Sequence, residues 1–204
     1  MNRLVIIALL IATVTAYSCG SLSDLASTKS FTKFNDKQLL FLVVEDSTNA
    51  EVFRAPFCPT VDKYGALVIN NLWDKIESSE TYYLHVEVWA KSKLMYSTSS
   101  KTLLSGGKFI PYRVVQVSTV NGGVTDIAWN NNVLCELCSS CLDDACYIGI
   151  SGKSTSAADM QAKVFVSWIG TDADGYVMTS DTTSISQFNF MDATSLHESM
   201  TDLS

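Results

Sequence analysis

The stretch that decides the fold of this chain is Thr81-Tyr82-Tyr83-Leu84-His85-Val86-Glu87-Val88-Trp89-Ala90, in which two kinds of side chain alternate. Successive side chains of a β-strand point to opposite faces. One face would therefore carry Tyr82, Leu84, Val86, Val88 and Ala90, and the other would carry Tyr83, His85, Glu87 and Trp89. The first set is apolar, so the stretch predicts a strand with one face in a hydrophobic core.

Further strand-like segments lie on both sides of this stretch. Short links rich in Gly, Asn and Ser separate them, and only Asn71–Ile76 offers a helical turn. The candidates number roughly nine to eleven, and they are residues 38–44, 51–57, 64–69, 81–90, 93–99, 109–120, 125–129, 147–150, 162–169, 176–179 and 186–191. This pattern predicts an all-β, mostly antiparallel fold, either a β-sandwich or a barrel.

The rhythm of these segments resembles that of immunoglobulin-like and fibronectin-like sandwiches. The resemblance is one of strand rhythm, because the Cys and Trp spacing that marks true immunoglobulin domains is missing. It implies a sandwich and carries no site residue. We expect one domain over residues 34–191 with a cysteine-rich loop at residues 135–146. The alternative is that this loop separates a larger domain, about residues 31–130, from a smaller one.

Six cysteines predict covalent staples: Cys19, Cys58, Cys135, Cys138, Cys141 and Cys146. In an oxidising compartment such a set forms disulfides, and six cysteines allow 15 pairings that spacing cannot distinguish. Cys19 with Cys58 is the preferred guess, since the other four are neighbours. Zinc or an iron–sulfur cluster is the alternative, but the crowded C-x2-C-x2-C-x4-C spacing is not typical of either.

The N-terminus predicts export. Residues 1–16 have a positive start, an apolar run from Leu4 to about Ala12 and small residues before a cleavage point after Ala16, as in a signal peptide. The run is too short to span a bilayer, so we expect no transmembrane segment and a secreted protein. A polar arm, residues 17–33, would follow. The alternative is a lipid-modified Cys19, although the residues before it fit that motif poorly.

The composition is acidic, with a formal net charge of −7. This charge disfavours nucleic acid and anionic membranes as partners, because both require clustered Lys and Arg. No Lys or Arg follows Lys163, so residues 192–204 form an acidic polar tail. A solvated tail is the preferred interpretation, and a cation-binding or basic-partner surface is the alternative.

Two groups of residues are candidate ligand sites. Tyr83, His85, Glu87 and Trp89 combine aromatic faces with hydrogen-bonding groups, which is what a sugar-binding surface needs. Asp172, Asp174 and Asp181 resemble part of a calcium loop, but position 170 is a glycine where the first calcium ligand would stand. A tight turn explains the same residues without an ion, so we expect no metal and no cofactor, with calcium as the alternative.

The sequence contains no concentrated catalytic set, since it has only two histidines and no nucleophile elbow or phosphate-binding glycine loop. We therefore expect a secreted, non-enzymatic structural or surface-coat subunit that assembles with other protein subunits. The first alternative is a carbohydrate-binding module that recognises extracellular glycans through the strand face above. The second is a secreted hydrolase whose carboxylates are dispersed along the chain.

Overall fold

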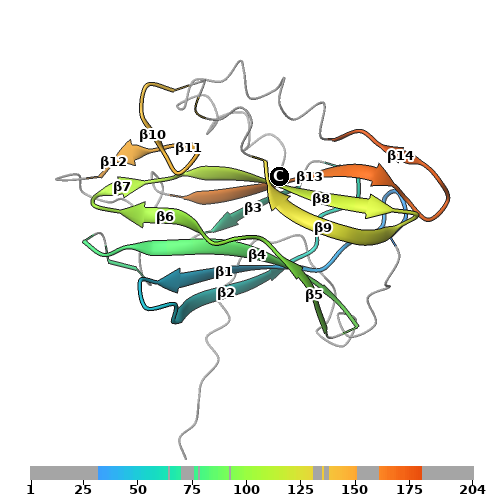
Figure 1. Cartoon of the computed structure of the whole chain (residues 1–204), viewed down its shortest axis with the longest axis horizontal. Helices are drawn as coiled ribbons and strands as arrows, with labels where there is room; N and C mark the ends of the chain where they lie inside the picture. Colours follow the sequence, from blue (N-terminus) through green and yellow to red (C-terminus); the bar gives the residue numbers. More distant parts are fainter. Residues whose placement is uncertain are drawn as a thin grey trace, which may run out of the picture.

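The computed structural model describes residues 32–63, 65–69, 76–77, 79–91, 93–130, 135, 138–150 and 161–180. Its named elements are all β-strands, arranged in two main sheets and one small hairpin (Figure 1). The all-β prediction is therefore confirmed. Neither sheet closes into a barrel among these strands. The expected signal peptide, most of the polar arm and the acidic tail lie outside the described residues.

The first sheet has seven strands in the order β12-β7-β6-β4-β1-β2, with β5 also paired to β4. All of its pairings are antiparallel. Its strands are β1 (Leu40–Asp46), β2 (Glu51–Phe57), β4 (Tyr82–Ala90), β5 (Lys93–Ser97), β6 (Lys101–Ser105), β7 (Lys108–Phe109) and β12 (Ile148–Gly149).

The second sheet has five strands in the order β14-β13-β8-β9, with β3 also paired to β13. Its strands are β3 (Gly65–Ile69), β8 (Tyr112–Val120), β9 (Gly123–Trp129), β13 (Ala162–Thr171) and β14 (Val177–Met178). Strand β13 runs parallel to β8, and the other pairings are antiparallel. The parallel pair is the exception within a fold that was predicted to be mostly antiparallel, and it joins segments far apart in the sequence.

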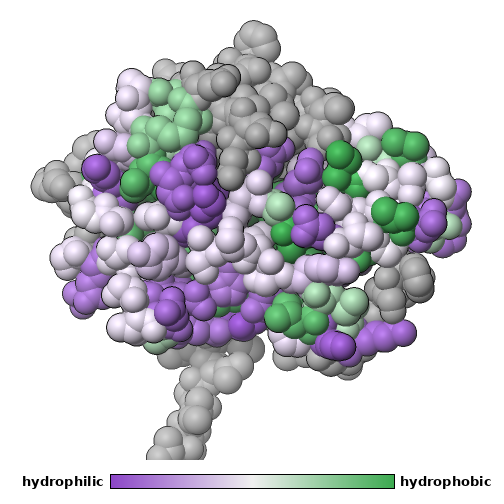
Figure 2. Space-filling model, viewed as in Figure 1, coloured by the Kyte–Doolittle hydropathy of each residue, from purple (hydrophilic) through white to green (hydrophobic). Residues whose placement is uncertain are grey.

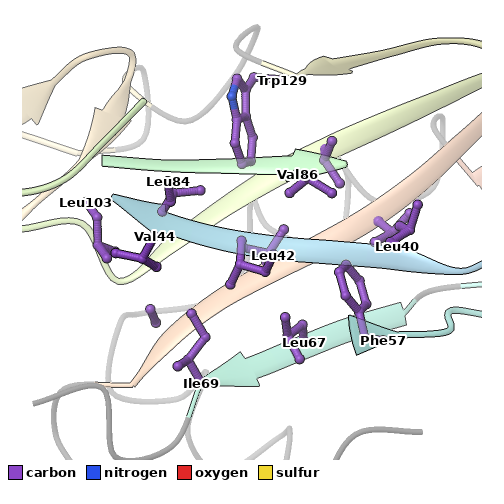
Figure 3. Close-up of a cluster of buried hydrophobic side chains, with 14 of the residues drawn as sticks. Leu40, Leu42, Val44, Phe57, Leu67, Ile69, Leu84, Val86, Leu103 and Trp129 are labelled. Atoms are coloured by element: carbon purple, nitrogen blue, oxygen red, sulfur yellow. The ribbon is translucent and has the colours of Figure 1, made fainter. Parts of the chain in front are cut away.

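One hydrophobic cluster fills the space between the two sheets. Strand β4 supplies its predicted core face, and Leu40, Leu42 and Val44 of β1 point the same way (Figure 3). The second sheet contributes Leu67 and Trp168, both almost fully buried. Burial of a large apolar side chain stabilises a fold by about 1.5–3 kcal/mol, so this shared core holds the two sheets together.

The cysteine-rich loop contains a third structure, the two-residue hairpin of β10 (Cys141–Leu142) and β11 (Ala145–Cys146). Its turn residues, Asp143 and Asp144, have φ angles of 50° and 62°. Two successive positive φ values are typical of the turns that match the twist of paired strands. Ala145 and Leu142 pack on Ile110 and Tyr112, so the hairpin lies against the start of β8.

Most strand predictions are confirmed, with one informative difference. Strand β6 was not predicted, because Lys101–Ser105 contains only two apolar residues and leads into a glycine turn. The strand predicted over 109–120, with a break at Pro111, is divided there into β7 and β8, because proline has no backbone N–H to donate to the ladder. Residues 71–75 of the predicted helical turn and the strand at 186–191 lie outside the described residues.

The segment before β1 docks at the end of the second sheet. The N–H of Thr32 donates to the carbonyl of Gly122 at 2.7 Å, and the N–H of Ala173 donates to the carbonyl of Thr32 at 3.1 Å. Gly122 has φ of +78°, and a Cβ there would lie 2.5 Å from the Thr32 oxygen. Only glycine fits this close approach of three loops. No helix in the part of the chain that is described is long and apolar enough to cross a membrane.

Candidate functional site

The structure brings the predicted ligand-binding residues together on the outer face of β4. In the register of β1 and β4, Phe41 lies opposite Glu87 and Val43 lies opposite His85. Arg54 of β2 lies opposite Val43 on its other side. We call the side chains of Phe41, Glu45, Arg54, His85, Glu87 and Trp89 on this face the β4 outer cluster.

Glu87 is the centre of the β4 outer cluster, and its residue is only 6% exposed. Arg54 Nη1 donates to Glu87 Oε2 at 2.6 Å and Nη2 donates to Oε1 at 3.3 Å. The indole Nε1 of Trp89 donates to Oε2 at 2.7 Å. Burial alone would raise the pKa of the Glu87 carboxyl, but these hydrogen bonds and the Arg54 charge outweigh burial and lower the pKa below its ordinary value. Glu87 is therefore held as a paired carboxylate.

Arg54 links Glu87 to a second carboxylate. Its Nη2 lies 2.9 Å from Glu51 Oε2, and its guanidinium carbon lies 5.5 Å from the centre of the Phe41 ring. The hydrogen bond that Arg54 donates to Glu51 is the main cause that raises the pKa of Arg54. A guanidinium over an aromatic face gains a cation–π attraction, so Arg54 is held from three sides.

His85 lies between two carboxylates. Its Nε2 is 3.4 Å from Glu87 Oε1, and its Nδ1 is 3.5 Å from Glu45 Oε2. Nδ1 is buried and makes no hydrogen bond. A neutral imidazole can donate from one nitrogen only, and the contact with Glu87 is made through Nε2. His85 is thus held between side chains of β1 and β4.

The aromatic part of the β4 outer cluster is also packed against its own neighbours. Phe41 and Trp89 meet edge to face with ring centres 5.6 Å apart, and both pack on buried Leu39 and Cys58. Three of the four predicted residues are thus joined by contacts to one another: His85, Glu87 and Trp89. Tyr83 shares the face and is half-buried. Much of the hydrogen-bonding capacity proposed for a sugar is used inside the cluster.

Sequence reasoning missed Arg54, the cation that pairs with Glu87. Phe41, whose ring lies below the Arg54 guanidinium, was not singled out either. The register of the β1–β2 hairpin is the signal that would have found Arg54, because it places Arg54 across β1 from His85.

The cysteine hairpin is closed by two disulfides, Cys135–Cys141 and Cys138–Cys146, with Cα separations of 5.4 and 5.9 Å. The prediction of disulfide bonding is confirmed. Cys58 is also disulfide-bonded. Its expected partner, Cys19, lies outside the described residues.

The turn of the cysteine hairpin is anchored to both sheets through Asp143. Lys101 Nζ of β6 lies 2.8 Å from Asp143 Oδ1, and the N–H of Thr102 donates to Oδ2 at 2.7 Å. From β8, Arg113 Nη1 donates to the Asp143 carbonyl and Nη2 donates to the Thr102 carbonyl, each at 2.9 Å. We call Lys101, Thr102, Arg113, Asp143 and Asp144 the hairpin clamp.

The hairpin clamp contains a buried cation. Arg113 is 3% exposed, and burial lowers its pKa to about 10. Burial raises the pKa of the Asp143 carboxyl. The hydrogen bonds that it accepts from Lys101 and Thr102, together with the charge of Arg113, outweigh burial and keep this pKa below its ordinary value. Adjacent side chains, such as those of Asp143 and Asp144, would point apart on an extended chain. Both reach Lys101 Nζ instead, because the turn gives them positive φ angles.

The residues of the candidate calcium loop have protein partners. Asp172 accepts the N–H of Phe34 at 2.9 Å and the N–H groups of Asp174 and Tyr176 at 2.8 Å. These bonds, with that from Phe34 first, lower the pKa of Asp172. Asp174 pairs with Lys33 at 3.0 Å. Asp181 lies outside the described residues, and no group of three or more potential metal ligands occurs among those described. Through these contacts, the loop binds the segment that precedes β1.

Comparison with known families gives one match, to a family model described as Uncharacterised protein DDB_G0273449, over residues 103–203. The matched region begins within β6 and includes the cysteine hairpin and the parallel β8–β13 pair. No curated protein and no solved structure matches the chain.

Proposed function

We propose that this chain is a secreted, disulfide-stapled structural or surface-coat subunit that assembles with further copies of itself and has no catalytic activity. We also infer that its two sheets form a β-sandwich of immunoglobulin-like or fibronectin-like rhythm, preceded by a signal peptide cut after Ala16. The disulfides support export, since such bonds persist in oxidising compartments.

The assembly proposal rests on the position of the large exposed apolar side chains. Most of the deep green surface in Figure 2 is at the end where Figure 1 places β5, β14 and the tip of β8. The exposed residues are Phe34, Leu94, Met95, Val120, Ile169, Tyr176 and Val177. Apolar groups gathered in one region of a surface mark contact sites, and we call this region the apolar end.

Charge supports a second copy as the occupant of the apolar end. Exposed Lys93 precedes Leu94 and Met95 on β5. Asp174 precedes Tyr176 and Val177, and it keeps 64% of its side chain exposed beside its partner Lys33. The β5 hairpin of one copy could therefore meet the β13–β14 loop of another with apolar contact and opposite charges, an arrangement that favours specific pairing.

The alternatives have less support. A carbohydrate-binding surface on Tyr83, His85, Glu87 and Trp89 would need free polar groups, and those of Glu87 and Trp89 bond each other and Arg54. A hydrolase would need a carboxyl poised to exchange a proton near neutral pH. Glu87 and Asp143 are instead paired with cations, and their pKa values lie below the ordinary range.

Sedimentation velocity on the purified chain across a range of concentrations tests the assembly proposal. We expect concentration-dependent oligomers, and we expect Val177→Glu and Leu94→Glu to shift them to monomers. Ser139→Glu, which adds the same charge at an exposed residue of the cysteine loop, should leave assembly unchanged. A wild-type protein that stays monomeric throughout, or a Ser139→Glu effect as large as that of Val177→Glu, would contradict the proposal.

A further inference from the structure

The register of strands β10 and β11 places opposite each other two cysteines that are not bonded to each other. Cys141 lies directly opposite Cys146 in the hairpin register. Neither is bonded to the other, because Cys141 is bonded to Cys135 and Cys146 is bonded to Cys138. Two disulfides therefore meet side by side on one hairpin.

The hydrogen bonds of the hairpin define the geometry of this cross-strand pair. Leu142 and Ala145 flank the two-residue turn, and the N–H of Tyr147 donates to the carbonyl of Ser140 at 3.1 Å. Cys141 and Cys146 thus occupy the non-hydrogen-bonded position between two hydrogen-bonded pairs. Residues at such positions have Cα atoms about 4.5 Å apart and the closest side chains, within the range of about 4.4–6.8 Å that a disulfide spans.

We propose that the cysteine hairpin is a thiol–disulfide exchange site with two internal pairings, and that a low-molecular-weight thiol enters it at Cys141. The first pairing is the one present, Cys135–Cys141 with Cys138–Cys146. The second is Cys141–Cys146 with Cys135–Cys138. Cys141 is exposed while Cys146 is buried, so an external thiolate reaches Cys141 first.

The exchange balances without an oxidant. The external thiolate attacks Cys141 Sγ, forms a mixed disulfide and releases the Cys135 thiolate. Cys135 then attacks Cys138 Sγ, forms Cys135–Cys138 and releases the Cys146 thiolate. Cys146 attacks Cys141 Sγ, forms Cys141–Cys146 and expels the external thiolate. Each step breaks one sulfur–sulfur bond and makes one, so the thiol acts as a catalyst and the number of disulfides is unchanged.

This site is independent of the proposed assembly, because its chemistry uses one molecule and lies in the hairpin rather than at the apolar end. Its consequence is that Cys141 is a site of S-thiolation. In the second pairing the hairpin would be stapled across its own strands, and the link from β11 back to Cys138 would be lost.

Disulfide mapping of the full chain tests the proposal directly. The oxidised protein is incubated at mildly alkaline pH with substoichiometric reduced glutathione, quenched with acid at intervals and mapped by mass spectrometry. We expect a transient glutathione adduct on Cys141, followed by Cys141–Cys146 and Cys135–Cys138 bonds in part of the sample. Persistence of the first pairing alone would overturn the proposal, and so would an adduct confined to another cysteine.

A pair of double variants tests the cross-strand geometry. Cys135→Ser with Cys138→Ser leaves the register partners Cys141 and Cys146, whereas Cys138→Ser with Cys141→Ser leaves Cys135 and Cys146, which are partners in neither pairing. In a glutathione redox buffer the first variant should close its internal disulfide at least about tenfold faster, because its thiols have the higher effective concentration. Equal rates in the two variants would contradict the geometry. If either variant fails to fold, the wild-type mapping decides.

Discussion

The β4 outer cluster and the hairpin clamp use the same chemistry in different places. Each centres on one carboxylate that an arginine and further donors hold, Glu87 in the first and Asp143 in the second. The outer cluster joins neighbouring strands of a single sheet, which the backbone ladder already holds together. The hairpin clamp joins β6 of one sheet, β8 of the other and the cysteine hairpin.

The difference shows how position sets the contribution of an ion pair. Arg54 keeps about a third of its side chain exposed, while Arg113 keeps 3%. Water that reaches the Arg54 guanidinium weakens its attraction to Glu87, whereas a cation left buried without its partner is strongly destabilising. The hairpin clamp should therefore contribute more to stability than the outer cluster, although the latter has the shorter arginine–carboxylate distance.

The largest effect is expected for Asp143→Asn. This change removes the charge that faces Lys101 and buried Arg113 but tolerates the positive φ angle. Because hydrogen bonds to charged groups contribute more than neutral ones, we expect the free energy of unfolding to fall by about 2–3 kcal/mol. Urea denaturation with the disulfides intact would measure it.

Asp144→Asn is the matched control for that prediction. Asp144 shares the turn, the positive φ and the Lys101 partner, but 56% of its side chain is exposed. Its replacement should change the free energy of unfolding by no more than about 0.5 kcal/mol. If the two variants lose equal stability, burial does not set the contribution of the clamp.

A smaller effect is expected for Glu87→Gln in the outer cluster. The amide keeps an acceptor but loses the charge that pairs with Arg54, so we expect a loss of about 1–2 kcal/mol. Glu51→Gln removes the other, more exposed carboxylate partner of Arg54. It should lower the free energy of unfolding by at most about 0.5 kcal/mol. A Glu87→Gln loss greater than that of Asp143→Asn would reverse the comparison between the two regions.

The two regions also differ in how far the sequence could predict them. The outer face of β4 follows from alternation within ten residues, so Tyr83, His85, Glu87 and Trp89 could be placed on one face. The hairpin clamp depends on β6, a strand with a weak apolar pattern, and on a turn whose φ angles direct two adjacent carboxylates to one lysine. It also depends on where Arg113 of β8 lies relative to β6, which local patterns do not encode.

The smallest effect is expected for the pH dependence that the two carboxylates share. The pKa values of Glu87 and Asp143 are lowered in the folded chain, so the folded state binds fewer protons than the unfolded state and is favoured at higher pH. The stabilisation is fully present above the ordinary carboxyl pKa of about 4, and it is lost as pH falls through the lowered values.

Urea denaturation tests this with the wild type and the Glu87→Gln, Asp143→Asn double variant, at about pH 6 and again at about pH 3. The difference between their free energies of unfolding should be smaller at the lower pH. Asp46 and Asp172, whose pKa values are also lowered, are present in both proteins and affect both equally. A difference that stays constant or widens at low pH would mean that the charges of Glu87 and Asp143 do not stabilise the fold, and that both residues act through shape alone.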